Sequence, residues 1–157
     1  SQFEDGLRTP VLIRWDGHVK PNTHEALVQT TDIIPTILSA AGLSEEVTPD
    51  MRGIDLMPSA IGHSPLPLRP AYGAIYPNDA KVLDDPARHF RGRWVREGDF
   101  KLILPGSGEK PIEAALYDLK DDSNEASNII KEPAYETQVR HLTELLNDWW
   151  PTSPNTE

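Results

Sequence analysis

Hydrophobic positions along this chain change their spacing from one segment to the next. The first apolar segment is an unbroken run, Val11-Leu12-Ile13, which continues through Arg14 and Trp15 to an Asp-Gly turn signal. A run without polar alternation is typical of a strand covered on both faces, as in sheets flanked by helices. The pattern therefore predicts a buried strand at residues 11–15. No partner strand precedes it, so we expect this strand to be the end of a larger sheet.

Helical spacing first appears at residues 30–42. The predicted apolar face of this helix consists of Ile33, Ile34, Ile37, Leu38 and Ala41. Thr30 or Thr31 is the expected N-cap, and Gly42 has the C-cap role. One short strand is too narrow to cover this face. We therefore predict either an exposed apolar patch or a covering domain that is missing from this chain.

The second half of the chain predicts a small antiparallel sheet and a terminal helix. Strands are expected at residues 71–76, 93–96, 100–104 and 116–119, and Glu97-Gly98-Asp99 is the turn of a hairpin. The helix begins at Pro133 and stops at Pro151, with an apolar face of Tyr135, Val139, Leu142, Leu146 and Trp149. Before the sheet, residues 25–28 suggest a short strand or bridge, and residues 43–70 a long loop.

Four segments, in chain order, resemble motifs of the sulfatase family. The opening E-D-G-L-R-T-P at residues 4–10 resembles E-G-G-x-R-x-P, with Asp5 in place of the second glycine. D-I-I-P-T-I-L at residues 32–38 resembles that family's D-hydrophobic-x-P-T-hydrophobic-L helix, and F-K-L-I at 100–103 its aromatic-K-L-I strand. L-Y-D-L at 116–119, followed by Asp122, Glu125 and Asn128, resembles LYDL…DPxExxNL, with Ser123 in place of proline.

The chain is thus identified as the C-terminal part of a formylglycine-dependent sulfatase of the alkaline-phosphatase-like superfamily. The resemblance implies an α+β fold in two parts. Residues 1–70 would be the end of an alkaline-phosphatase-like α/β domain, contributing a strand and a helix. Residues 71–157 would be an antiparallel-sheet subdomain packed by a C-terminal helix. The parent enzyme would hydrolyse sulfate esters or sulfamates, with carbohydrates among its substrates, in a periplasmic, secreted or lysosomal compartment.

The resemblance also implies that the reacting groups lie upstream. Family members carry a C/S-x-P-x-R nucleophile motif and carboxylate ligands for calcium, and their late catalytic lysine would fall about two residues before Ser1. S-P-L-P-L-R at residues 64–69 has its proline and arginine one position too late for the nucleophile motif. We therefore assign no catalytic or metal residue and no cofactor to this chain, and we expect the isolated chain to be inactive. Calcium and formylglycine are expected in the parent enzyme.

Composition narrows the classes of function. A net charge of −10 argues against nucleic-acid binding, and no apolar run approaches the roughly 20 residues of a membrane span. Without cysteine the chain has no disulfides and no thiolate metal ligands. The aspartate pairs at 84–85 and 121–122 are interpreted as solvated turn carboxylates, and Asp122, Glu125 and Asn128 as side chains that satisfy a tight turn. The five histidines lack the spacing of a metal motif, and Trp94 and Trp149 are expected in the core.

The polar segment after residue 76 is the best candidate for a binding site. Long polar loops are disproportionately functional, and arginine offers forked donors to sulfate or carboxylate groups. The candidate substrate-binding residues are Tyr76, Asn78, Asp79, His89, Arg91 and Arg93. The competing interpretation is an ordinary surface loop in which arginines pair with nearby aspartates. Arg8 is predicted to brace the loop that bears the catalytic lysine near the active site.

Two other functions stay open at this point. The first is a phosphodiester or phosphonate hydrolase of the same superfamily, and the second is a stand-alone carbohydrate-binding or interaction module. The expected partners are a sulfated small molecule or glycan bound through the parent enzyme and the N-terminal catalytic portion of the same protein. We also predict self-association of the isolated chain through the apolar face of the helix at residues 33–41.

Overall fold

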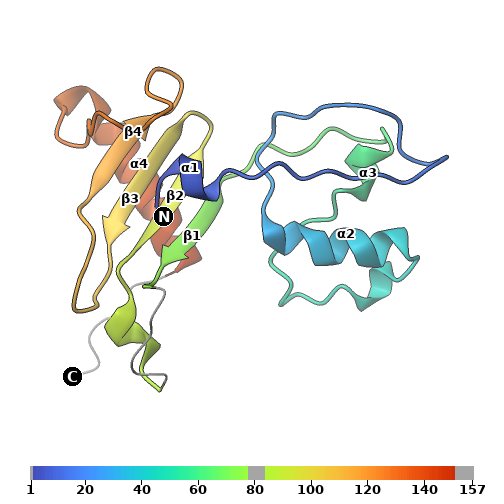
Figure 1. The fold of residues 1–157 in the computed structure, drawn as a ribbon, viewed down its shortest axis with the longest axis horizontal. Coiled ribbons are helices and arrows are strands. Elements are labelled where there is room, and N and C mark those ends of the chain that lie inside the picture. Colours follow the sequence, from blue (N-terminus) through green and yellow to red (C-terminus); the bar gives the residue numbers. More distant parts are fainter. Residues whose placement is uncertain (1, 78–83, 151–157) are drawn as a thin grey trace. The chain divides into compact units, whose positions relative to one another are not determined.

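The computed structural model describes residues 2–77 and 84–150 and divides the chain into two compact units (Figure 1). The sheet unit consists of residues 1–8 and 70–157, and the helix–loop unit of residues 9–69. Residues 2–8, which the sequence analysis grouped with the first domain, therefore belong to the sheet unit.

The sheet unit contains four antiparallel strands in the order β1-β2-β3-β4. They are β1 (Ala71–Ile75), β2 (Gly92–Glu97), β3 (Phe100–Pro105) and β4 (Ala115–Asp118). Glu97 pairs with Phe100 across the predicted hairpin, so Gly98 and Asp99 form a two-residue turn. Gly98 adopts a φ of +57°, a conformation that glycine accepts without steric cost. The predicted sheet is confirmed, strand by strand.

One face of the sheet is covered by the terminal helix α4 (Glu136–Trp149), which follows a short 3₁₀ turn, η4 (Pro133–Tyr135). Its Leu142 and Leu146 are fully buried against strand residues of β2, β3 and β4, namely Val95, Leu102 and Leu116. Trp149 stacks on Tyr72 with ring centroids 5.1 Å apart. The apolar spacing of the sequence therefore identified the helix and its buried face correctly.

The opposite face of the sheet carries α1 (Glu4–Leu7), which lies on the other side of the strands from α4 (Figure 1). Strand alternation places Lys101 and Ile103 of β3 on this face, and Lys101 lies opposite Tyr117 of the neighbouring strand β4. The ring of Phe3 meets Tyr117 edge-on at 6.4 Å. Gly73 is required here because a Cβ atom would lie 2.4 Å from the indole nitrogen of Trp94. Residues 3–7 thus cover part of a second apolar layer.

The helix–loop unit is built around η1 (Thr30–Asp32) and α2 (Ile33–Ala40), with the short helices η2 (Ser44–Glu46) and α3 (Met57–Ala60). The carboxylate of Asp32 is fully buried, accepts hydrogen bonds from Gln29 N at 2.7 Å and Ile54 N at 2.9 Å, and forms an ion pair with Arg69. The N-terminal cap is therefore a box between Gln29 and Asp32 instead of the predicted Thr30 or Thr31. These bonds tie loop 54–69 to the start of α2.

The predicted C-terminus of α2 is confirmed. Gly42 has a φ of +73°, Leu43 N donates to Leu38 O at 2.8 Å, and Gly42 N donates to Ser39 O at 3.0 Å. This pair of bonds closes a helix end with glycine in the left-handed conformation.

The predicted strand at residues 11–15 is wrong for this chain. The segment forms no strand, and its central residue Leu12 is 92% exposed. A strand exists only where a neighbour accepts and donates its backbone hydrogen bonds, and no described segment pairs with this one. Residues 25–28 likewise form neither a strand nor a bridge. The Asp-Gly turn is present, with Gly17 at a φ of +81°.

The apolar face of α2 is exposed in the structure. Ile34 and Ile37 are 54% and 56% exposed and Ile33 is 39% exposed, whereas the buried residues of the helix are Pro35 and Thr36. Thr36 Oγ1 accepts a hydrogen bond from Leu56 N at 2.9 Å, which explains why a polar residue faces inward. The helix therefore exposes its isoleucines to solvent. This is the exposed apolar patch, one of the two outcomes that the sequence predicted.

Within the described residues, none of the helices has both the length and the apolar character needed to cross a membrane.

Candidate functional site

The candidate substrate-binding segment runs from the end of β1 to the start of β2. Asn78 and Asp79 lie outside the described residues. Beyond them the chain forms a 3₁₀ turn, η3 (Pro86–His89), and returns to the sheet where Arg91 N donates to Ile75 O at 2.9 Å. The structure thus brings Tyr76, His89 and Arg91 to the same end of β1 and β2.

Aromatic packing fixes Tyr76 in this region. Its ring centroid lies 5.7 Å from that of buried Phe90, and the other neighbour of Phe90 is Trp150, stacked at 5.4 Å. Tyr76 remains 39% exposed, and burial of the rest of the side chain raises the pKa of its phenol. A phenol held in this way offers a neutral hydroxyl and one accessible ring face at physiological pH.

Arg91 lies beside a second loop, residues 105–112. Its carbonyl accepts hydrogen bonds from Gly106 N and Ile112 N, both at 2.9 Å, and its Nε donates to Lys110 O at 3.0 Å. Within the described part of the chain the two Nη groups of Arg91 have no hydrogen-bond partner, so they can receive an anion. Arg88, by contrast, pairs with Glu109 at the surface.

Arg93 differs from the other candidate residues because its side chain is buried beneath α4. Strand alternation places it on the face that α4 covers, where it is 4% exposed. Nη1 donates to Leu146 O at 3.0 Å and to Trp150 O, and Nη2 donates to Asn147 Oδ1 at 2.7 Å. Burial lowers the pKa of this guanidinium group. Arg93 therefore caps the carboxyl end of α4, and the surroundings of its side chain do not support the expected role in substrate binding.

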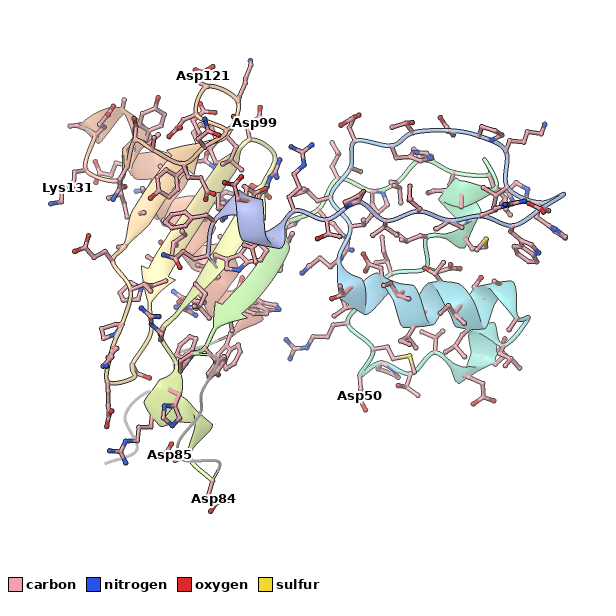
Figure 2. The ribbon with its side chains drawn as sticks, viewed as in Figure 1. Asp50, Asp84, Asp85, Asp99, Asp121 and Lys131 are labelled. Carbon is pink, nitrogen blue, oxygen red and sulfur yellow. The ribbon has the colours of Figure 1, made fainter. Side chains whose placement is uncertain are left out.

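The other sequence-predicted residues lie on the surface. The side chain of Arg8 is exposed at the end of α1, where Arg8 N donates to Glu4 O at 2.8 Å. Figure 2 shows Asp84 and Asp85 at the outer end of the η3 segment and Asp121 at the turn after β4. Asp85 Oδ1 accepts from Arg88 N at 3.3 Å and so caps η3. His141, on the polar side of α4, pairs with Glu97 at 2.7 Å.

The turn after β4 is stabilised largely as predicted. Asp122 accepts hydrogen bonds from Ala126 N at 3.1 Å and Ser127 N at 2.8 Å, and these backbone donors lower the pKa of its carboxyl group. Asn128 Oδ1 accepts from Leu116 N at 3.1 Å, and its Nδ2 donates to Ala114 O at 3.0 Å. The turn interpretation holds for Asp122 and Asn128.

Glu125 belongs to a buried ionic cluster that sequence reasoning missed. Lys101 Nζ is fully buried, 2.8 Å from Glu125 Oε1 and 3.1 Å from Glu4 Oε1, and it lies 5.6 Å from the centroid of the Trp94 ring. Glu4 also pairs with Arg96, and Glu4 N donates to Glu125 Oε2. The sequence signal was a lysine inside an otherwise apolar strand, F-K-L-I-L. We call Glu4, Arg96, Lys101 and Glu125 the Lys101 cluster.

Among the described residues, no three histidine, aspartate or glutamate side chains lie close enough together to hold a metal ion. The groups that the structure does gather are cationic and aromatic ones at the β1–β2 end of the sheet and the balanced charges of the Lys101 cluster. The first arrangement suits recognition of an anion or a sugar. The second suits the fixing of one segment against another.

Comparison with known proteins decides the family. Residues 2–150 match the family described as N-sulphoglucosamine sulphohydrolase, C-terminal. The chain belongs to this family of C-terminal sulfatase domains. A curated relative, the Delta 4,5-hexuronate-2-O-sulfatase of Bacteroides thetaiotaomicron, is 28% identical over 152 residues, which cover 95% of this chain and 30% of that protein. The sulfatase domain thus spans less than a third of the length of the curated relatives it matches.

Solved structures share the fold of the sulfatase domain. A protein in complex with its substrate D-glucosamine-2-N,6-O-disulfate superposes with a TM-score of 0.59 at 30% identity, over 75% of this chain and 23% of that one. The phosphonate monoester hydrolase of Agrobacterium radiobacter superposes with a TM-score of 0.60 at 23% identity, over 80% of this chain and 25% of that one. The expected α+β fold is therefore confirmed.

Proposed function

We propose that this chain is the C-terminal part of a sulfatase that hydrolyses sulfate esters or sulfamates of carbohydrates. The match to the sulfatase C-terminal family over residues 2–150 carries this proposal. The printed names of two relatives support the substrate class, one a hexuronate-2-O-sulfatase and the other solved with a disulfated glucosamine. We call the longer protein that would contain this chain the parent sulfatase.

We propose that this chain supports the upstream catalytic part and helps to select the substrate, and that it contributes no reacting group. The formylglycine nucleophile and the calcium ligands are proposed to lie in the upstream part of the parent sulfatase. The residues of this chain that we propose to contact the substrate are Tyr76, His89 and Arg91. Asn78 and Asp79, which lie between Tyr76 and His89 in the sequence, belong to the same proposal. In the chemistry proposed, Arg91 donates from its Nη groups, which have no partner among the described residues, to a sulfate or carboxylate, and Tyr76 offers its ring to a sugar. Arg8 is proposed to brace the upstream catalytic loop.

The role of Arg91 is tested in the parent sulfatase with matched substrates. Replacing His89 and Arg91 by alanine should lower kcat/KM for sulfated disaccharides by about 10–100-fold, the range expected for hydrogen bonds to charged groups. Hydrolysis of 4-nitrophenyl sulfate, which carries no sugar for these residues to contact, should stay within about twofold of wild type. Arg88→Ala is the control, because Arg88 pairs with Glu109 at the surface. Equal kcat/KM values for the disaccharides in all three proteins would remove these residues from the substrate site.

An assay of the same parent protein with two substrates distinguishes sulfate ester hydrolysis from phosphonate ester hydrolysis. The likeness to a phosphonate monoester hydrolase shows a shared fold and does not favour either reaction. A parent protein that cleaves phenyl phosphonate esters faster than 4-nitrophenyl sulfate would replace the sulfatase proposal with the phosphonate one.

A further inference from the structure

The Lys101 cluster joins three segments that are far apart in the sequence. Glu4 comes from α1, Lys101 from β3 and Glu125 from the turn after β4, and Arg96 of β2 completes the set. Two carboxylates face two cations, so the cluster is neutral as a whole. The side chain of Glu4 is 12% exposed and that of Lys101 fully buried. Charges this deeply buried are retained only when each has a partner.

Glu125 contacts both β3 and the first segment of the chain. One of its oxygens pairs with Lys101 at 2.8 Å, and the other accepts the backbone N–H of Glu4. Its φ of +53° lies in the left-handed region, which side chains other than glycine seldom adopt. The conformation that brings Glu125 onto Glu4 is therefore costly by itself and is maintained by these contacts.

A cluster of paired charges fixes the relative position of two segments more narrowly than an apolar contact does. Well-packed apolar side chains in place of a buried ion pair are often as stable or more stable, so stability alone does not account for the buried pair of Lys101 and Glu125 with its partly buried partners Glu4 and Arg96. An apolar layer tolerates small shifts between segments. Paired charges with fixed hydrogen bonds do not. Beside them, the ring of Phe3 meets that of Tyr117 edge-on.

We propose that Glu4, Lys101, Glu125 and Arg96 are positioning residues that fix residues 2–7 in one register on the sheet. The proposal rests on the proposed function, because its consequence concerns the parent sulfatase. In the proposed parent sulfatase, the segment that precedes residues 2–7 would meet the sheet at a point that this cluster determines. Any reacting group carried close to that point is then held in place by the C-terminal sheet, and loosening the cluster slows the reaction more than it weakens substrate binding.

The test uses Glu4→Gln in the parent sulfatase, which removes one charge with little change of shape. Hydrogen exchange of the amides of residues 4–8 should accelerate by about 10–100-fold, the factor that corresponds to a charged hydrogen bond. In the same protein kcat for 4-nitrophenyl sulfate should fall by about tenfold or more, since small misplacements of reacting groups are costly, while KM stays within about twofold. Arg96→Gln should act in the same direction and serves if the first variant folds poorly.

The matched control is Leu102→Val, at the neighbouring position of β3. Leu102 is fully buried on the α4 face, so this variant lowers the melting temperature without touching the cluster. It should leave the exchange of residues 4–8 and kcat close to wild type. Glu4→Gln with wild-type exchange and wild-type kcat overturns the inference. A parent protein without sulfatase activity overturns the proposed function instead, and the exchange of residues 4–8 still decides whether the cluster fixes that segment.

Discussion

Lys101 Nζ lies 2.8 Å from Glu125 Oε1, and both side chains are almost completely buried. The pair links the middle of β3 to the turn after β4, and Glu4 joins it from the beginning of the chain. Two of the motifs by which the chain resembles sulfatases, F-K-L-I and D-x-x-E-x-x-N, therefore meet in space.

Replacing Lys101 by methionine should destabilise the chain strongly. The variant keeps the volume of the side chain but leaves two buried carboxylates with Arg96 as their one remaining cation among the described residues. Breaking a buried ion pair costs about 3–5 kcal/mol, and we expect a loss of this size in the free energy of unfolding, measured with urea. Lys131→Met is the control, because Lys131 is exposed (Figure 2). A loss below about 1 kcal/mol would show that the cluster contributes little to stability.

Substitution of Arg93 should affect stability, and substitution of Arg91 should not. Arg93→Met removes the donors to Leu146 O and Asn147 Oδ1 at the end of α4. Losing buried hydrogen bonds from a charged group should cost roughly 2–4 kcal/mol in the free energy of unfolding. Arg91→Ala, two positions away, should change it by less than about 1 kcal/mol. If the two variants unfolded at the same urea concentration, the capping role of Arg93 would be disproved.

The carboxylate of Asp122 makes the turn after β4 sensitive to acid. Backbone hydrogen bonds from Ala126 and Ser127 lower its pKa, so the folded state binds this proton less readily than the unfolded chain does. The stabilisation is present above the unfolded-state pKa of about 3.9 and is lost as the pH falls through the lower folded-state value. Asp122→Asn should therefore be less stable than wild type at a pH of about 6, and the difference should shrink below a pH of about 3. A difference that stays constant between these pH values would contradict this assignment.

The exposed isoleucines of α2 predict association of the isolated chain. Ile34 and Ile37 are more than half exposed and lie on one face of the helix with Ile33. The double variant Ile34→Ser/Ile37→Ser should shift the mass measured by light scattering toward the monomer. Leu68→Ser is the control, because Leu68 is 95% exposed but lies in a loop. A monomeric wild-type chain at high concentration would count against association through this face.

Local patterns predicted the sheet unit well. Alternation, the Gly98 turn and the 4-3-4-3 spacing of α4 depend on short-range geometry, and the strands and the helix formed where these signals placed them. The predicted strand at residues 11–15 failed for a different reason. Its apolar run is typical of a strand that needs neighbouring strands, and no segment among the described residues pairs with it. A pattern can show what a segment is suited for without showing that its partner is present.

Residue roles were harder to predict than elements. Arg93 looked like a member of the polar loop, but its position in β2 turned it toward α4. Glu125 looked like a turn residue, but a left-handed backbone conformation aimed it at Lys101. Both depend on contacts between residues more than twenty positions apart. The sequence offered one clue, and only for Glu125: a lysine inside the otherwise apolar strand F-K-L-I-L.

We propose that this chain supports a sulfatase whose reacting groups lie upstream. The most direct measurement compares sulfate release from 4-nitrophenyl sulfate and a sulfated disaccharide by the parent protein and by the 157-residue chain alone. We predict turnover by the parent protein and none by the isolated chain. Cleavage of a sulfate ester by the isolated chain, or no cleavage by the parent protein, would contradict the account.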